Sequence, residues 1–317
     1  MENIFLGNLI RRRREALNIR QDTLCSGICN TMTLSRLENG QQLPARHKIV
    51  AIMDRLGLPS DRYYAILSKN DENISILQSE INSLVVQAER ETDNTTNKKI
   101  KQARKKIKLL ENISEKSDNI IKQFVMSEEL TLKKLENTIS LDDQLNMAIQ
   151  TLKITVPQIN FNNITSFLLS LDEITLLNQI SIIYSRKEQH DIAIQIYSQT
   201  FDYIQKHLDN TTYFASTLIL IAHNYARELD LTQQYHKASA ISQIGIHSCI
   251  EHEHYQFLPG LLHIQAEAWY YLGDDKKSLD LFYQAYNLYK SLGNTQGIIL
   301  LQEDANICLQ ADLSSHP

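Results

Sequence analysis

The chain has 317 residues but only nine glycines and five prolines, about 4% together against about 12% in average usage. So few turn-forming residues disfavour all-β, collagen-like and Pro/Gly-rich disordered folds, and 43% hydrophobic residues are enough for one large core or two smaller ones. The net charge of −5 hides an asymmetry, because residues 1–70 hold 11 Lys/Arg against 6 Asp/Glu while the remainder is acidic. A small basic domain joined to a large acidic one is typical of a nucleic-acid reader attached to a domain of another kind.

The cysteines and the N-terminus indicate where the protein works. The four cysteines include no CxxC pair, which predicts reduced thiols rather than a disulfide framework or a zinc finger. The N-terminus lacks the apolar stretch of a signal peptide, because four arginines occupy positions 11–14, and no run of 18 apolar residues occurs. We therefore expect a cytoplasmic protein.

The N-terminal segment is predicted to form five short helices. Apolar spacing and capping residues place them at residues 6–17, at 21–28, at 31–39, from Pro44 to Gly57, and from Pro59 onward. Asn30 is a good N-cap for the third helix, and Asn39-Gly40 is a typical helix end. Leu34 and Leu37 of that helix face the core, which leaves the face formed by Thr31, Met32, Thr33, Ser35 and Arg36 exposed.

The order and spacing of these residues resemble the Cro/XRE-type helix-turn-helix domain over residues 4–68. The matching elements are IRRRR (10–14), NIRQ (18–21), Leu24, LSRLENG (34–40), Pro44 and LGL (56–58). The resemblance implies DNA binding, with Gln21 on a backbone phosphate, Thr31, Met32 and Thr33 near base edges, Arg36 on phosphate or base, and Glu38 paired with Arg14. Helix N-termini and arginines position a duplex, and side chains in the major groove read it. The expected DNA-binding set is Arg12, Gln21, Thr31, Met32, Thr33, Ser35 and Arg36.

Two other interpretations of this segment stay open. The arginines at 11–14 are also compatible with a solvated helix face, and the whole domain with a protein-binding version of the same fold.

The remainder, residues 71–317, carries a helical pattern interrupted by short polar stretches, with almost no strand signal. Three units align when Ala193, Ala238 and Ser278 are taken as equivalent, and the stretch from Trp269 to Asp274 resembles a tetratricopeptide repeat. We therefore expect an all-α protein. A five-helix helix-turn-helix domain (1–70) would be followed by a right-handed tetratricopeptide-like solenoid (71–317) that binds peptide and dimerises.

This layout resembles the peptide-responsive regulators of the Rgg/PlcR/PrgX group, known as the RRNPP type. The segments LKITVP (152–157), LDEITLLNQI (171–180) and AIQIY (193–197) carry the likeness in the repeat region. The resemblance implies a homodimeric transcription factor that binds an operator in double-stranded DNA and is switched by a short signalling peptide in its concave groove, as in quorum sensing. Amides clamp the peptide backbone in that group, because an amide both donates and accepts. The candidates here are Asn178, Asn224 and Gln265, which are also compatible with structural amides.

Other functions find weaker support. The basic stretch 98–108 is compatible with a second nucleic-acid patch, although the apolar spacing of Ile100, Ala103 and Ile107 favours a solvated helix face. The segment 247–254 pairs His247 with Glu251 and Cys249 with His252, which offers too few ligands for a closed zinc site. No phosphate loop, GxSxG or HExxH motif occurs, so we expect neither an enzyme nor a cofactor. The alternative function is a repeat-based scaffold or response-regulator modulator with an accessory DNA-binding domain.

Overall fold

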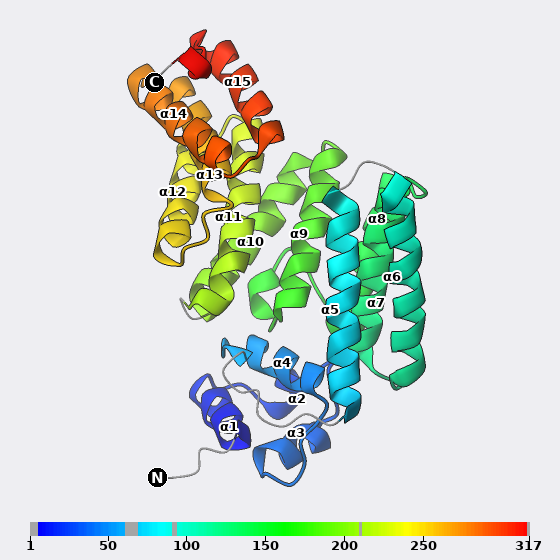
Figure 1. Cartoon of the computed structure of the whole chain (residues 1–317). Coiled ribbons are helices and arrows are strands. Elements are labelled where there is room, and N and C mark those ends of the chain that lie inside the picture. Colours follow the sequence, from blue (N-terminus) through cyan, green and yellow to red (C-terminus); the bar gives the residue numbers. More distant parts are fainter. Residues whose placement is uncertain (1–5, 61–68, 91–93, 209–210, 316–317) are drawn as a thin grey trace. The chain divides into compact units, whose positions relative to one another are not determined.

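The structure is a computed structural model that describes residues 6–60, 69–90, 94–208 and 211–315. Within these residues it contains fifteen α-helices and no strand, which confirms the predicted all-α class (Figure 1). Among the described helices, none is long and apolar enough to cross a membrane. The contacts divide the chain into two compact units, unit 1 with residues 1–186 and unit 2 with residues 187–317.

The helices follow one another with short connections. Unit 1 contains α1 (Leu6–Ala16), α2 (Gln21–Cys25), α3 (Thr31–Glu38), α4 (Arg46–Arg55), α5 (Lys69–Arg90), α6 (Asn94–Ile113), α7 (Asn119–Leu135), α8 (Leu141–Thr155) and α9 (Leu171–Arg186). Unit 2 contains α10 (His190–His207), α11 (Thr212–Leu231), α12 (Tyr235–Glu251), α13 (Leu258–Tyr271), α14 (Asp275–Ser291) and α15 (Thr295–Leu309).

Helices α1 to α4 form a small bundle around a common apolar core. The third helix begins as predicted, because the Asn30 side chain accepts a hydrogen bond from the backbone N–H of Thr33 at 2.7 Å. Helix α2 ends at Cys25, earlier than predicted, and the chain then turns through Gly27 with φ +74°. The predicted fifth helix falls largely on residues outside the described ranges. The buried core residues are Ile10, Leu24, Ile28, Leu34, Leu37, Ile52, Met53 and Leu56.

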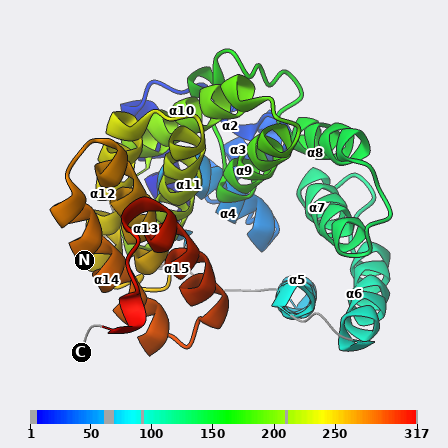
Figure 2. The ribbon, with the colours of Figure 1, turned by 90° about the horizontal axis from the view of Figure 1, so that it is seen from above.

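The rest of unit 1 consists of antiparallel helices packed as hairpins. Figure 2 shows α6 and α8 as an outer layer and α5, α7 and α9 as an inner layer. Helix α6 carries the basic stretch, and its apolar positions, including Ile100 and Ala103, are buried as the spacing predicted. Arg104 pairs with Glu136 at 2.7 Å and with Glu129 at 3.3 Å. Arg104 is thus ion-paired, while Lys101, Lys105 and Lys108 are exposed, as expected for a solvated helix face.

Unit 2 repeats the hairpin arrangement, with α11 against α12 and α13 against α14. The three residues aligned from the sequence, Ala193, Ala238 and Ser278, occupy corresponding positions on α10, α12 and α14, and all are fully buried. The Ser278 hydroxyl donates to the backbone oxygen of Ala266 at 2.8 Å, so even the polar member of this set is satisfied in the interior. Small side chains there let paired helices approach closely. The tetratricopeptide-like packing is thus confirmed.

One arginine attaches the four-helix bundle to the hairpins of unit 1. Arg55, at the end of α4, is buried and donates through Nη1 to the backbone oxygens of Leu24 at 3.1 Å and Ser26 at 2.6 Å. Its Nη2 donates to the backbone oxygen of Thr155 at 3.2 Å and to Glu173 Oε1 at 2.8 Å. The guanidinium thereby bonds to the end of α2, the end of α8 and the start of α9.

Glu173 is fully buried and also caps its own helix. Its Oε2 accepts from the backbone N–H of Ser170 at 2.7 Å, and the Ser170 hydroxyl accepts from the backbone N–H of Glu173 at 3.4 Å. This reciprocal arrangement is a capping box, in which both otherwise unpaired donors at the helix start are satisfied. Both carboxylate oxygens of Glu173 are thus engaged, one by the α9 backbone and the other by Arg55.

Two further contacts secure the same junction. A Cβ at Gly27 would lie 2.0 Å from the backbone oxygen of Thr155, so the α2 turn touches the end of α8 directly. Asp118 Oδ2 lies 2.7 Å from His47 Nε2 and 3.0 Å from Lys48 Nζ. Burial alone would raise the pKa of Asp118, but the hydrogen bonds and charges of His47 and Lys48 outweigh it and lower the pKa to about 2.

We expect Arg55→Met to lower the free energy of unfolding by about 3–5 kcal/mol, because it leaves the Glu173 carboxylate buried without its cation. The double variant Arg55→Met, Glu173→Gln should recover a large part of that loss, since the glutamine amide keeps the cap acceptor without the charge. The measurement is urea unfolding followed by far-ultraviolet circular dichroism. Arg12→Met, on an exposed arginine, is the control and should change stability little. Equal losses in Arg55→Met and the double variant would contradict this assignment.

Candidate nucleic-acid interface and repeat groove

Helix α3 presents a short polar face to solvent. Thr31, Met32 and Arg36 are exposed, and Met32 is 61% exposed despite its apolar side chain. Thr33 and Ser35 are half-buried, and the Thr33 hydroxyl donates to Asn30 Oδ1 at 2.9 Å. Thr31, Met32 and Arg36 are therefore the members of the predicted set on α3 best placed to reach a bound molecule.

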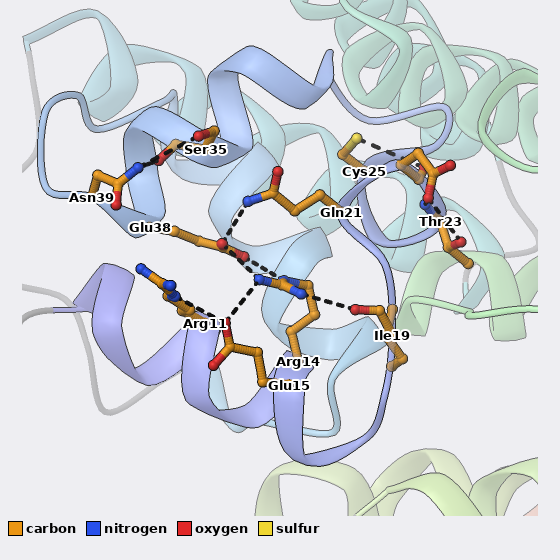
Figure 3. A network of polar contacts seen from close by, with 11 residues as sticks. Arg11, Arg14, Glu15, Ile19, Gln21, Thr23, Cys25, Ser35, Glu38 and Asn39 are labelled. Atoms are coloured by element: carbon orange, nitrogen blue, oxygen red, sulfur yellow. Dashed lines mark hydrogen bonds and ion pairs between the residues drawn. The ribbon is translucent and has the colours of Figure 1, made fainter.

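A buried carboxylate fixes the orientation of α3. Glu38 accepts hydrogen bonds from Arg14 Nε at 2.6 Å and Arg14 Nη2 at 2.9 Å, and from Gln21 Nε2 at 2.7 Å (Figure 3). The hydrogen bonds from Arg14 to Glu38 raise the pKa of the guanidinium, whose partner carboxylate is buried. The implied pair of Arg14 and Glu38 is thus present, and it holds α3 against α1 and α2. The predicted contact of Gln21 with a phosphate stays a prediction. In this structure the amide nitrogen of Gln21 donates to Glu38.

The four consecutive arginines of α1 have different environments. Arg11 Nε pairs with Glu15 at 2.9 Å, Arg13 Nε donates to the backbone oxygen of Leu56 at 3.0 Å, and Arg14 binds Glu38. Arg12 is exposed. The run is therefore more than a solvated face, because Arg13 and Arg14 bind other parts of the bundle, and Arg12 is the member best placed to meet a phosphate.

Helices α5, α7 and α9 line a groove of about 310 Å³ in unit 1. Its apolar surface comes from two valines of α5, Phe124 and Leu176, and three helices each contribute one carboxylate. Gln123, at the base, is buried and donates to Thr155 Oγ1 at 2.6 Å, so its amide is fixed in place. The lining residues are Asn82, Val85, Val86, Glu89, Gln123, Phe124, Ser127, Glu128, Thr131, Asp172, Thr175, Leu176 and Gln179.

The three predicted peptide-binding amides have different surroundings. Asn178, on α9 of unit 1, is buried and is not among the residues that line the groove. Asn224, on α11 of unit 2, is half-buried, with Oδ1 3.1 Å from His223 Nδ1. Gln265, on α13, is buried and donates to Gln243 Oε1 at 2.9 Å. Their role in peptide binding stays a prediction.

Unit 2 holds a polar cluster that the sequence analysis missed. On α13, His263 Nε2 lies 2.9 Å from Asp304 Oδ2 of α15. Arg227, on α11, lies 2.6 Å from Glu267 Oε2 and 3.4 Å from Asp230 Oδ2. Burial, followed by the charge of Glu267, raises the pKa of Asp230 to about 7.

Part of this cluster could have been found from the sequence, and part could not. His263 and Glu267 are four residues apart, a spacing that places two side chains on one helix face. Asp304 lies on another helix, so nothing in its sequence position joins it to them. Within the described residues this is the group whose histidine and carboxylate atoms converge to metal-ligand spacing. In the segment 247–254, which the sequence analysis considered for zinc, His247 is exposed whereas Cys249 is buried.

Comparison with known proteins relates this fold to solved structures. No family model matches the chain. No curated protein matches it either. PlcR from Bacillus thuringiensis, in its crystal structure with the peptide PapR7 and DNA, superposes with a TM-score of 0.57 at 16% identity, covering 94% of this chain and 98% of PlcR.

Two further solved structures give similar values. Apo PlcR has a TM-score of 0.55 at 14% identity and covers 93% of this chain and 97% of PlcR. The apo form of the competence regulator ComR from Streptococcus vestibularis has a TM-score of 0.51 at 14% identity and covers 96% of this chain and 98% of ComR. The chain has the fold of these RRNPP-type regulators over nearly its whole length, as the resemblance predicted.

The exposed face of α3 leads to a prediction about nucleic acid. We expect Arg36→Ala to lower affinity for duplexes selected from a random pool and to relax base preference by about 1–3 kcal/mol at one position. Arg12→Ala should weaken binding to all sequences alike and reduce the dependence of affinity on salt. Fluorescence anisotropy at several salt concentrations measures both effects. Lys276→Ala, on an exposed lysine of α14, is the control. Wild-type affinity and salt dependence in both variants would rule out this surface.

Proposed function

We propose that this protein is a sequence-specific DNA-binding transcription regulator controlled by a short signalling peptide. The observation that carries the proposal is the exposed polar face of α3, whose orientation is held by the hydrogen bonds of Glu38. The same unit contains the groove between α5, α7 and α9. A short helix with an exposed polar face can enter the major groove of DNA. The solved structure of PlcR, which has the same fold, contains both a peptide and DNA.

The groove of unit 1 supports the peptide half of the proposal. Tetratricopeptide-like hairpins create concave surfaces on their inner helices, and such surfaces accommodate extended peptides. Apolar side chains in this groove can bury peptide side chains, and its amides and hydroxyls can bond to peptide backbone. In this proposal the protein works in the cytoplasm, and the peptide reports on the surrounding cell population.

Helix α9 offers a direct mechanical connection between the two binding surfaces. Asp172 lines the groove, and the next residue, Glu173, bonds to Arg55 at the end of α4. A peptide that shifts the first turn of α9 would change this bond and so the attachment of the DNA-binding bundle. Such a ligand acts by binding one arrangement better than the other.

An unpartnered apolar face supports a homodimer. On α15, the last long helix, Ile299, Leu300 and Ile307 are 52%, 49% and 71% exposed. Residues 299, 300 and 307 share one face of the helix, on which the exposed Glu303 lies between Ile299 and Ile307. Exposed apolar groups of this kind mark interaction surfaces, and a symmetric pair of bundles would suit a palindromic operator.

The dimer is tested by sedimentation velocity. We expect the wild type to sediment as a dimer and the variant Ile299→Asp, Ile307→Asp as a monomer with weakened binding to palindromic DNA, because a carboxylate cannot be buried cheaply in an apolar interface. Asn287→Asp, at an exposed position on α14, adds a carboxylate outside this face of α15 and should leave the dimer intact. A variant that remains dimeric would show that α15 is not the interface.

One experiment tests the proposed function as a whole. The purified protein is incubated with spent medium of its source organism and studied by native mass spectrometry, alone and with selected duplex DNA. We expect a bound short peptide whose presence changes the affinity for DNA. Binding of DNA without any peptide effect would leave only the DNA-binding half of the proposal. Capture of a response regulator from a lysate of the same cells, with no peptide retained from the medium, would favour the alternative function.

A further inference from the structure

We propose that the groove between α5, α7 and α9 selects a peptide that carries a positively charged group beside apolar side chains, with Glu128 as the partner of that group. This inference rests on the proposed function, because it names the chemical class of the peptide ligand. It depends on three observations: the origin of the carboxylates, their spacing and the charges around them.

The carboxylates come from three separate helices and converge on one groove. Glu89 lies on α5, Glu128 on α7 and Asp172 on α9, and all three line the cavity. Glu128 is half-buried, whereas Glu89 and Asp172 are exposed within the groove. Among the thirteen lining residues there is no lysine, arginine or histidine. The groove surface is therefore uniformly negative where it carries charge.

The nearest cations do not neutralise the groove. Lys134, further along α7, interacts with Glu89, and Arg186 at the end of α9 interacts with Lys134. Burial lowers the pKa of Lys134, with a further contribution from Arg186, while Glu89 acts in the opposite direction. Neither cation lines the groove, and the interactions that shift the pKa of Glu128 come from carboxylates.

The spacing of the carboxylates suits an organic cation better than a metal ion. Within the described residues, the group with ligand atoms within 4.8 Å of one another is His263, Glu267 and Asp304, and the groove carboxylates do not meet that spacing. A Lys or Arg side chain, or a free N-terminal ammonium, carries several donors and can bridge more widely spaced acceptors. Val85, Val86, Phe124 and Leu176 provide apolar contact for the stem of such a side chain and for its neighbours.

The electrostatic environment of Glu128 favours binding of a cation. Burial, followed by repulsion from Glu89 and Asp172, raises the pKa of Glu128 to about 7. A bound cation stabilises the ionised carboxylate, so binding releases a proton from the fraction of molecules in which Glu128 is protonated. Affinity for a lysine-bearing peptide should therefore rise as the pH increases from 6 to 8, because the carboxylate ionises in that interval while the lysine stays charged.

The experiment uses four pools of amidated heptapeptides with random apolar residues around a fixed centre. Three pools are N-terminally acetylated and carry lysine, norleucine or glutamate at the centre. The fourth has norleucine and a free N-terminus, which separates a side-chain cation from a terminal ammonium. Affinity selection with mass spectrometry identifies binders, and calorimetry at pH 6 and pH 8 measures their affinity for the full-length wild type, Glu128→Gln and Glu129→Gln.

We expect binders from the lysine pool or the free-ammonium pool to exceed those of the acetylated norleucine pool by about tenfold in affinity, which corresponds to about 1.4 kcal/mol. Glu128→Gln should remove this preference and flatten the pH dependence. The neighbouring Glu129, which pairs with Arg104 outside the groove, is the matched control and should leave both unchanged.

Each outcome separates this inference from the proposed function. Equal binding of cationic and acetylated norleucine peptides, or a preference for glutamate, would overturn the charge selection while a peptide receptor remains. A cationic preference that persists in Glu128→Gln, with circular dichroism matching the wild type, would overturn the assignment of Glu128. Failure of all four pools would contradict both this inference and the peptide half of the proposed function.

Discussion

The buried ion pair of Arg55 and Glu173 is the interaction on which the arrangement of unit 1 depends. One guanidinium satisfies backbone oxygens at the ends of α2 and α8, and the same group neutralises a carboxylate that caps α9. Desolvating two charges is costly. Here the cost is offset by hydrogen bonds to both carboxylate oxygens of Glu173 and from both Nη atoms of Arg55, while the buried Arg55 Nε has no partner. The four-helix bundle and the hairpins are thereby joined at one position. The close contact between Gly27 and the backbone of Thr155 restricts any shift of the α2 turn relative to α8.

This junction places the exposed face of α3 and the groove between α5, α7 and α9 within one unit. Helix α3 owes its orientation to Glu38, while α4, packed in the same bundle, ends at Arg55. On the other side of the junction, α9 contributes consecutive residues to different tasks, with Asp172 in the groove and Glu173 bonded to Arg55. Charge in the groove and attachment of the four-helix bundle are therefore adjacent on a single helical turn, as the proposed control of DNA binding by a peptide requires.

Local signals in the sequence predicted the helices well, but the sequence did not predict the contacts between distant segments. Asn30 correctly predicted the start of α3. The apolar spacing of Ile100, Ala103 and Ile107 identified the buried face of α6, although this helix carries seven basic residues in the same stretch. Arg55 looked like an ordinary basic residue at a helix end, because its partner lies 118 positions away. The groove carboxylates were missed for the same reason, since they come from three helices. Peptide binding by the three predicted amides stays a prediction; Asn178 and Gln265 are buried, and Asn224 is half-buried.

Hydrogen–deuterium exchange of the wild type and Arg55→Met tests most directly whether this ion pair unites the bundle with the hairpins. If it does, the variant should lose protection in α2 to α4 and in the first turns of α9 together, with similar opening free energies, because both segments then open as one cooperative unit. Loss of protection confined to α2 to α4, with α9 exchanging as in the wild type, would contradict the central role of the Arg55–Glu173 pair.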